Sequence, residues 1–322
     1  VALGVVGPFA WRDWRAGTIE CWRAARVALR QTTLPQSVRL DPARVLVETL
    51  AALDRLVTSV DPGSLDVAVA PEMLLPLVPA ADDPPETVQR YARELGVPIL
   101  FGARGPGAAG EQELNSVYLM EPGGLSDFRW DKHHLVPLVE RPVLLTAALR
   151  GAVGVEGADD GFRAGTGWPI ADAAGAGFGA MICFESAFPD VARGLRRAGA
   201  DVLVNVTNDA WFGDELGDAR TAALWQHPAH LVMRAIETRS AVVRVGNAGF
   251  SFWVDPVGRV HDVIDVFVEA AAVVEVRTSD VETVFVRFGD VLGNACGLSG
   301  IVLLLASLAG RPGRRRPVRA GG

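Results

Sequence analysis

Short apolar segments alternate with helical segments along most of the chain, and this alternation limits the possible folds more than any other feature of the sequence. The helical segments carry apolar residues at helical spacing, and two of them open at Pro42 and at Glu86, with residues typical of helix N-termini. Strands that are apolar throughout are typical of sheets covered by helices. The sequence therefore predicts an α/β protein with about ten or more strands. Strands are expected at 25–31, 65–70, 98–102, 116–120, 179–182, 201–206, 241–245, 250–254 and 271–276, and helices at 42–60, 86–95, 189–200 and 227–239.

The C-terminal part of the sequence has a different character. Residues 291–309 are nineteen consecutive residues without a charge, and the basic sequence RPGRRRPVR follows at once. A segment of this length and composition predicts a transmembrane helix, and the arginines indicate that its far end lies in the cytoplasm. The alternative is a buried C-terminal helix of a soluble protein, but such a helix would need a polar face, which this segment lacks. The main body is then expected on the extracytoplasmic side.

Four parts are predicted along the chain. Residues 1–25 are interpreted as the end of a membrane segment and a linker, although the opening apolar run would also suit a buried core segment. Residues 26–285 form the main α/β domain, residues 286–310 the transmembrane helix, and residues 311–322 a basic cytoplasmic tail.

Charge and cysteine content exclude several kinds of site. The net charge is −7, and residues 1–310 alone contain 26 basic and 38 acidic residues, so the body would repel phosphates and no nucleic acid is expected as a partner. The three cysteines are far apart and lack CxxC spacing, which excludes a disulfide framework and a cysteine-based zinc site. His227 and His230 stand in HPAH without an HExxH context, so no metal is expected there.

Cys183 is the first candidate for chemistry. It directly follows the strand predicted at 179–182 and precedes a predicted helix. A strand-to-helix turn would expose its side chain, and the N–H dipoles of the helix are expected to favour the thiolate over the thiol. A lone cysteine is more often a small buried apolar residue, and a nucleophile would also need a base and an oxyanion stabiliser.

Two charged residues stand where charges are unexpected. Glu72 follows the strand predicted at 65–70 and is flanked by Pro71 and the apolar run 73–75, so partial desolvation would suit it to act as a general base. The alternative is an ordinary strand-end acid in solvent. Lys132 would normally be a solvated surface residue, but it is the only lysine in the chain, which indicates a place that needs a compact cation rather than a guanidinium.

Around these residues the sequence resembles the carbon–nitrogen hydrolase (nitrilase) superfamily, whose triad is Glu, Lys and Cys in that order. Within it, the sequence resembles the apolipoprotein N-acyltransferase family more closely. The lysine segment of that family reads roughly KxHLVPFGEYVP, and residues 132–143 read KHHLVPLVERPV. Its cysteine segment reads ICYExxFP, and residues 182–189 read ICFESAFP. The resemblance runs from about Arg26 to Gly258 and includes LPQSVRLDP (34–42), NDAWFGD (208–214), QH (226–227), MRAIET (233–238) and RVGNAGFS (244–251).

The resemblance implies a nitrilase-like αββα sandwich with a C-terminal transmembrane helix. It also implies that Glu72 is the base, that Lys132 stabilises the oxyanion and that Cys183 attacks the substrate. Trp211 and Phe212 are candidates to line a pocket for acyl chains, although plain core packing would explain them equally well.

Further residues are assigned supporting places by the same resemblance. Glu140 would position or tune Lys132, and Phe184 and Glu185 flank the nucleophile. Phe184 stands where the family usually has tyrosine, and Leu40, a candidate substrate-lining residue, stands where it often has tryptophan. These departures leave the expected chemistry intact and change the substrate-lining contacts.

The activity implied by the resemblance is acyl transfer in two steps. A fatty acyl chain would pass from a phospholipid to Cys183 as a thioester, and then to the N-terminal amine of a diacylglyceryl-cysteine lipoprotein. No cofactor is expected, and the resemblance places the enzyme in the bacterial cytoplasmic (inner) membrane. One alternative is an amidase or nitrilase with water as the acceptor, which would have no use for residues 291–319. Another is an inactive, membrane-tethered binding domain.

Overall fold

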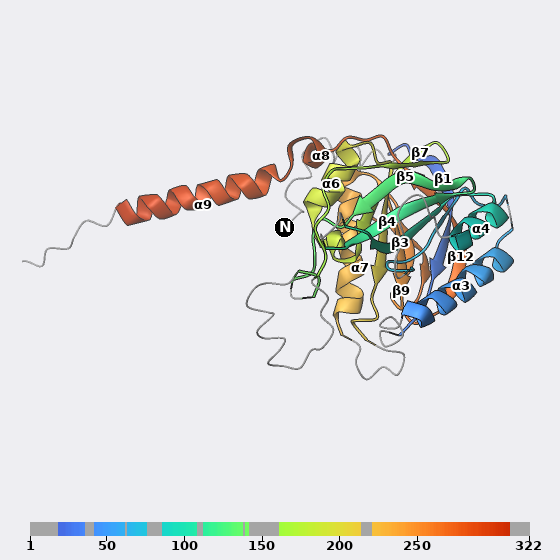
Figure 1. The fold of residues 1–322 in the computed structure, drawn as a ribbon. Helices are drawn as coiled ribbons and strands as arrows, with labels where there is room; N and C mark the ends of the chain where they lie inside the picture. The colour runs from blue at the N-terminus through green and yellow to red at the C-terminus, as the bar shows by residue number, and fades with distance from the viewer. Residues whose placement is uncertain are drawn as a thin grey trace, which may run out of the picture.

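Two six-stranded sheets pack face to face, with helices on their outer faces (Figure 1). The structure is a computed structural model that describes residues 19–35, 42–61, 63–75, 86–107, 112–137, 139–141, 161–213 and 221–309. The expected αββα sandwich is confirmed. Strand β8, Val202–Asn208, shows why such a sequence needs this fold: all of its residues are buried, as expected for a strand covered on both faces.

The first sheet has the strand order β12-β1-β2-β3-β4-β5. Its β1, β2 and β3 are parallel, and antiparallel strands flank them on both sides. Helices α3 (Pro42–Ser59) and α4 (Glu86–Leu95) cover its outer face. The strands are β1 (Trp22–Gln31), β2 (Val67–Val69), β3 (Ile99–Gly105), β4 (Leu114–Glu121), β5 (Gly124–Asp131) and β12 (Ala270–Thr278).

The second sheet has the order β11-β10-β9-β8-β7-β6 and repeats this plan, because its central strands β7, β8 and β9 are parallel and its outer strands are antiparallel. Helices α6 (Pro189–Arg197) and α7 (Ala223–Thr238) cover its outer face. The remaining strands are β6 (Ala171–Ala173), β7 (Ala176–Ile182), β9 (Ala241–Asn247), β10 (Ser251–Val254) and β11 (Val260–Ile264).

Alternation of side chains along the strands divides the core into layers. In β1, Val27 and Leu29 belong to the core between the two sheets, whereas Ala28 faces the outer layer, where it packs with Leu53 and Leu56 of α3. Both sets are almost completely buried. The two sheets are therefore held together by a shared apolar core.

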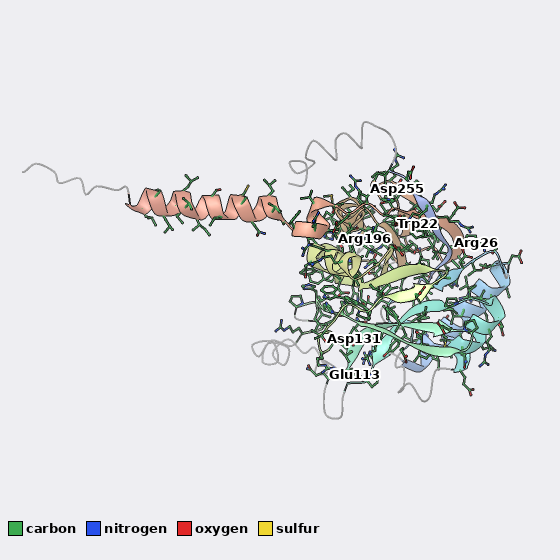
Figure 2. The ribbon with its side chains drawn as sticks, turned by 90° about the horizontal axis from the view of Figure 1, so that it is seen from above. Trp22, Arg26, Glu113, Asp131, Arg196 and Asp255 are labelled. Atoms are coloured by element: carbon green, nitrogen blue, oxygen red, sulfur yellow. The ribbon has the colours of Figure 1, made fainter. Side chains whose placement is uncertain are left out.

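Strands β5, β6 and β11 are absent from the sequence-based expectations. In the second half of β5, buried Phe128 and Trp130 alternate with half-buried Arg129 and Asp131, so this strand has no continuous apolar run of the kind that indicated other strands. Strand β5 ends at Asp131, labelled in Figure 2, and Lys132 follows directly. Helix α7 also begins at Ala223, four residues before the expected start, and Pro228 lies inside it.

Carboxyl ends of the parallel strands gather at one edge of the sandwich. At this edge Thr32, after β1, forms a bridge with Asn247, at the end of β9, and so joins the two sheets. The Thr32 hydroxyl also donates to the side-chain oxygen of Asn247 at 2.8 Å. Loops that follow such strand ends are the usual place for a site in parallel sheets, because side chains from several strands converge there.

Helix α9, Val291–Ala309, stands clear of the sandwich in both views (Figures 1 and 2). It follows the short helix α8, Val284–Phe288. Among the described residues it is the one helix long and apolar enough to cross a membrane, and none of its apolar window 291–308 is buried. The division of the chain into the four predicted parts remains a prediction, and residues 1–18 and 310–322 lie outside the described residues.

Gly102 tests how closely β3 approaches the segment that carries Glu72. A Cβ at this position would lie 2.6 Å from Cα of Glu72 and 2.7 Å from the amide nitrogen of Met73. Because both atoms belong to the main chain, we expect Gly102→Ala to lower the free energy of unfolding by about 1–3 kcal/mol, the usual cost of overpacking. Gly123→Ala is the control, since a Cβ there meets nothing within 4 Å. Equal unfolding free energies for the two variants, measured by denaturant titration in detergent, would contradict the close approach.

Candidate active site

Glu72, Lys132 and Cys183 come from three strand ends and meet at the common edge. Glu72 follows β2, Lys132 follows β5, and Cys183 follows β7. The main-chain N–H of Asn208, at the end of β8, donates to Oε2 of Glu72 at 2.9 Å and so ties the first sheet to the second. The structure thus places together the three residues proposed from the sequence.

Lys132 lies between two carboxylates. Its Nζ is 2.8 Å from Oε1 of Glu140 and 3.4 Å from Oε1 of Glu72. The amide of Asn115 donates to the same two oxygens, at 2.8 Å to Glu72 and 3.0 Å to Glu140. Lys132 is only 1% exposed, and Glu72 and Glu140 are also buried. Asn115 was not selected from the sequence, because an asparagine within a strand carries no signal of its own.

These charges set the protonation of the lysine. Burial disfavours the ammonium, but the carboxylates of Glu72 and Glu140 outweigh it, so the pKa of Lys132 is raised above its ordinary value. The main-chain N–H of Val136 holds the other oxygen of Glu140 at 2.8 Å. Lys132 is therefore a fixed ammonium that can donate to a developing negative charge.

The Cys183 thiol behaves differently from the expectation. Burial, and next the charge of Glu72, raise its pKa to about 12, while Lys132 acts in the opposite direction with a smaller effect. The expected preference for the thiolate is therefore wrong for this resting state, because burial and the neighbouring carboxylate outweigh the effects of Lys132 and of a hydrogen bond from Thr207. A thiol of this kind needs a base at the moment of attack, and Glu72 is close enough for its charge to act on the sulfur.

Cys183 occupies a strained turn. It begins the 3₁₀ helix η2, Cys183–Ala187, directly after β7, with φ at +48°. The expected strand-to-helix turn is thus present, and its left-handed backbone is uncommon for a residue with a side chain. The Cys183 carbonyl lies 2.9 Å from Nε2 of His227, and the Asn205 amide is 3.4 Å from the same oxygen.

Glu185 anchors this turn to the lysine segment. Its fully buried carboxylate accepts hydrogen bonds from the N–H of Ile182 at 2.7 Å, from the indole of Trp130 at 3.0 Å and from the N–H of His133 at 2.6 Å. Burial raises the pKa of Glu185 against the effect of these donors. Glu185 therefore fixes the segment before Cys183 relative to the segment after Lys132.

A second buried charge cluster lies behind the nucleophile. Asp209 and Arg244 are both fully buried, and Nη2 of Arg244 is 2.5 Å from Oδ2 of Asp209. Nδ1 of His227 is 3.0 Å from the other Asp209 oxygen. Burial opposes ionisation of Asp209, but Arg244 and His227 lower its pKa to about 2. Both His227 ring nitrogens have protein partners, which explains this histidine without a metal. Neither Asp209 nor Arg244 was selected from the sequence, although an arginine inside the apolar segment 241–245 is unusual.

The remaining candidates are placed less centrally. Phe184 is half-buried and lies edge-on to Phe188, with ring centroids 5.0 Å apart. Trp211 is 58% exposed, and Phe212 packs edge-on against His227 with centroids 5.7 Å apart. Leu40 lies outside the described residues. Acyl-chain contact by Trp211, Phe212 and Leu40 stays a prediction.

Comparisons with known proteins find similarity over most of the chain. The carbon–nitrogen hydrolase family profile matches residues 26–284. The chain is 35% identical over 293 residues to "Apolipoprotein N-acyltransferase" of Geobacter metallireducens and 31% identical over 299 residues to the protein of that name from Haemophilus influenzae. Each alignment covers 89% of this chain and 54% of the relative, so the chain spans about half the length of these curated relatives.

Solved structures share the fold at low sequence identity. An amidase from Nesterenkonia sp. superposes with a TM-score of 0.56 at 18% identity, covering 88% of this chain and 99% of the amidase. Nit3 of Saccharomyces cerevisiae, a member of branch 10 of the nitrilase superfamily, gives a TM-score of 0.58 at 13% identity, covering 92% of this chain and 98% of Nit3. At such identities these likenesses concern the fold alone.

The raised thiol pKa predicts the pH dependence of alkylation. In a variant whose Cys21 and Cys296 are serines, we expect the rate of Cys183 labelling by iodoacetamide to be still rising at about pH 10, because an ordinary thiol is fully ionised there and this one is not. Glu72→Gln removes a negative charge beside the sulfur and should move the profile to lower pH. Free cysteine, titrated in parallel, is the control. A labelling rate that levels off below about pH 9 would show a thiolate-favouring site.

Proposed function

The chain belongs to the carbon–nitrogen hydrolase family, and from that premise we propose that it is an N-acyltransferase. In this proposal Cys183 takes a fatty acyl chain from a phospholipid and passes it to the N-terminal amine of a diacylglyceryl-cysteine lipoprotein. The observation that carries the proposal is Lys132, the only lysine of the chain, held buried between Glu72 and Glu140 beside Cys183. The name of the relatives, apolipoprotein N-acyltransferase, supports the choice of acceptor.

The first step forms the thioester. As the Cys183 sulfur attacks the ester carbonyl of the phospholipid, Glu72 accepts the thiol proton and the carbonyl oxygen becomes an oxyanion, which Lys132 stabilises by donating from Nζ. Collapse of the tetrahedral intermediate breaks the ester bond. Glu72 returns the proton to the leaving alkoxide, which departs as lysophospholipid. The protein is left as an acyl thioester with Glu72 ionised.

The second step consumes the thioester. The lipoprotein amine attacks the thioester carbonyl, Lys132 again stabilises the oxyanion, and Glu72 accepts a proton from the attacking nitrogen. Cleavage of the C–S bond releases the amide, and the proton on Glu72 returns to the thiolate. The raised pKa of the Cys183 thiol favours this last transfer, since a poorly stabilised thiolate readily takes up a proton.

We further propose that α9 spans the bacterial inner membrane, with the sandwich on the extracytoplasmic side. Exposure of the apolar window 291–308 in the structure and the arginine-rich sequence after it support this topology. A membrane location would bring the site close to both proposed substrates, because phospholipids and lipid-modified proteins are held at the bilayer.

Incubation of the full chain with phospholipid tests the acyl-transfer chemistry. We expect mass spectrometry to find one acyl adduct, labile to hydroxylamine, on Cys183, and no adduct in Cys183→Ala. Cys21→Ala and Cys296→Ala are the matched controls and should keep the adduct. A diacylglyceryl-cysteine peptide should then discharge the thioester much faster than water does. Discharge to free fatty acid at the same rate with and without peptide would instead indicate a hydrolase, and absence of any adduct would indicate an inactive binding domain.

Reporter fusions test the topology. A cytoplasm-active reporter fused after Gly322 should be active, because the arginines beyond α9 should keep the tail inside. An export-dependent reporter inserted after Arg287, with α9 kept behind it, should also be active, because Arg287 lies before the span. The two reporters exchanged between these sites are the controls and should be silent. The reverse pattern would place Cys183 in the cytoplasm and favour the amidase alternative.

A further inference from the structure

The short helix α8, Val284–Phe288, presents exposed apolar side chains just before the proposed membrane span. Val284 is 58% exposed and Phe288 is 63% exposed. The two residues are four positions apart, so they share one face of the helix. Val281, before α8, and Val291, at the start of α9, are exposed as well. A continuous run of exposed apolar side chains, unlike a single one, indicates a surface that contacts something apolar.

The inner face of α8 is fixed to the sandwich. Val286, on this face, is buried. Nε of Arg193, from α6, donates to the carbonyls of Phe285 and Val286, each at 2.9 Å, and its Nη2 donates to the carbonyl of Arg287 at 3.2 Å. A cation at the last turn of a helix satisfies carbonyls that have no partner within the helix. Arg193 therefore holds α8 with its exposed apolar face outwards.

Helix α7 holds the other end of α8. The Thr283 hydroxyl donates to the carbonyl of Glu237 at 2.5 Å and caps α8 by accepting from the N–H of Val286 at 3.0 Å. Helices α6 and α7 also meet the turn that carries Cys183. Arg234 of α7 donates to the carbonyl of Ser186 at 3.1 Å, and α6 begins directly after this turn. The two helices that fix α8 thus also fix the nucleophile.

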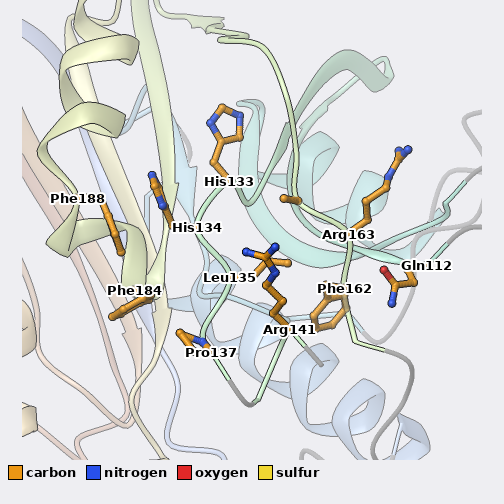
Figure 3. Close-up of a pocket in the computed structure, with 11 residues that line it drawn as sticks. Gln112, His133, His134, Leu135, Pro137, Arg141, Phe162, Arg163, Phe184 and Phe188 are labelled. Carbon is orange, nitrogen blue, oxygen red and sulfur yellow. The ribbon is translucent and has the colours of Figure 1, made fainter. Parts of the chain in front are cut away.

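The start of α6 also contributes to a pocket of about 580 Å³ beside the triad. Figure 3 shows Phe188, the residue before α6, along one wall of this pocket with His134 and with Phe184, the neighbour of Cys183. The His134 ring stacks on Phe188 with centroids 3.9 Å apart. Contacts of α6 therefore relate the position of α8 to that of the site.

Chain geometry keeps α8 near the bilayer if α9 spans it. Phe288 lies three residues before Val291, so their Cα atoms are at most about 11 Å apart. The link is folded, because the Val291 N–H donates to the carbonyl of Gly289 at 2.9 Å, which makes the real separation shorter. The headgroup region is about 5–7 Å thick on each side of the hydrocarbon core. Phe288 is therefore expected among the headgroups.

The side chains at this level suit a lipid surface. The Arg287 guanidinium lies 5.3 Å from the centroid of the Phe288 ring. In this arrangement the ring can contact lipid carbon atoms while the guanidinium stays among the phosphates. The carboxylate of Asp290 accepts from the N–H of Gly293 at 2.8 Å and so caps the start of α9. The charged groups thus lie at the point where the chain would enter the hydrocarbon.

We propose that α8 lies on the bilayer surface, with Val284 and Phe288 among the headgroups and the upper acyl carbons. The inference rests on the proposed membrane span of α9 and adds a second point of contact to it. A single spanning helix would let the sandwich turn about the end of α9, whereas two points of contact fix its orientation. Because α6 and α7 join α8 to the turn of Cys183, the site would keep a fixed position relative to the lipids.

Fluorescence quenching by lipids tests this contact. The full chain, with its three native cysteines replaced by serine, receives one cysteine by Val284→Cys or Phe288→Cys. The cysteine is labelled with an environment-sensitive dye, and the protein is reconstituted in vesicles of phosphatidylethanolamine and phosphatidylglycerol. Spin-labelled phospholipid, with the nitroxide close to the headgroup, should reduce the emission at either position by more than about half.

Two matched positions bound this result. Leu304→Cys places the label within α9 and should be quenched by nitroxide carried deep in the acyl chain. Val47→Cys places it at a residue that is 65% exposed on α3. Helix α3 lies on the side of the sandwich away from α9 in both views (Figures 1 and 2), so this label should not be quenched.

The outcomes separate the contact of α8 from the span of α9. Quenching at Leu304 without quenching at 284 and 288 would overturn the contact and leave the span intact. Absence of quenching at Leu304 would contradict the span, and the contact with it. A blue-shifted emission at 284 and 288 that lipid does not quench would mean that a protein surface, such as a second copy of the chain, covers α8 instead. Since the labelled chain has no nucleophile, the result is independent of acyl transfer.

Discussion

The ammonium of Lys132, buried between the carboxylates of Glu72 and Glu140, is the interaction on which the rest of the site depends. A buried cation is tolerated only where its partners are fixed, and removal of one partner from such a group typically costs about 3–5 kcal/mol. Here the partners are fixed by Asn115 and by main-chain donors at Val136 and Asn208. Because Asn115 belongs to the first sheet and Asn208 to the second, the cation is stabilised only when the two sheets are packed together.

The nucleophile depends on a second set of buried charges. Asp209, Arg244 and His227 lie behind Cys183, and His227 meets the Cys183 carbonyl. This contact supports a backbone conformation that a side-chain-bearing residue rarely adopts. The thiol itself stays protonated at rest, since its pKa is raised to about 12. Two fixed charge clusters and a neutral nucleophile between them suit a reaction in which charge appears only when substrate is attacked.

Much of the fold and of the candidate site could be predicted from the sequence. Strands buried on both faces leave continuous apolar runs, and Lys132 stands out because it is the only lysine. The apolar runs predict sheets covered by helices, whereas the αββα sandwich and the triad of Glu72, Lys132 and Cys183 came from the resemblance to the family. Strand β5 escaped, since its half-polar pattern resembles a loop. The thiol pKa was predicted in the wrong direction, because local helix dipoles can be inferred from a motif whereas burial and the distance to Glu72 cannot. Asn115 and the role of Asp209 depend on long-range contacts that no local pattern reveals.

The central claim is that the cation at position 132 stabilises the oxyanion and is more than a structural partner of two carboxylates. Lys132→Arg tests this most directly, since it keeps the charge and changes its shape. The measurement is the single-turnover rate of Cys183 acylation by phospholipid, with Arg259→Lys at an exposed position as the control. We expect Lys132→Arg to acylate about 100-fold or more slowly while its unfolding transition shows that the fold is kept, because the wider guanidinium cannot occupy the same point between the carboxylates and the substrate. A rate near that of the unmodified chain would contradict the account.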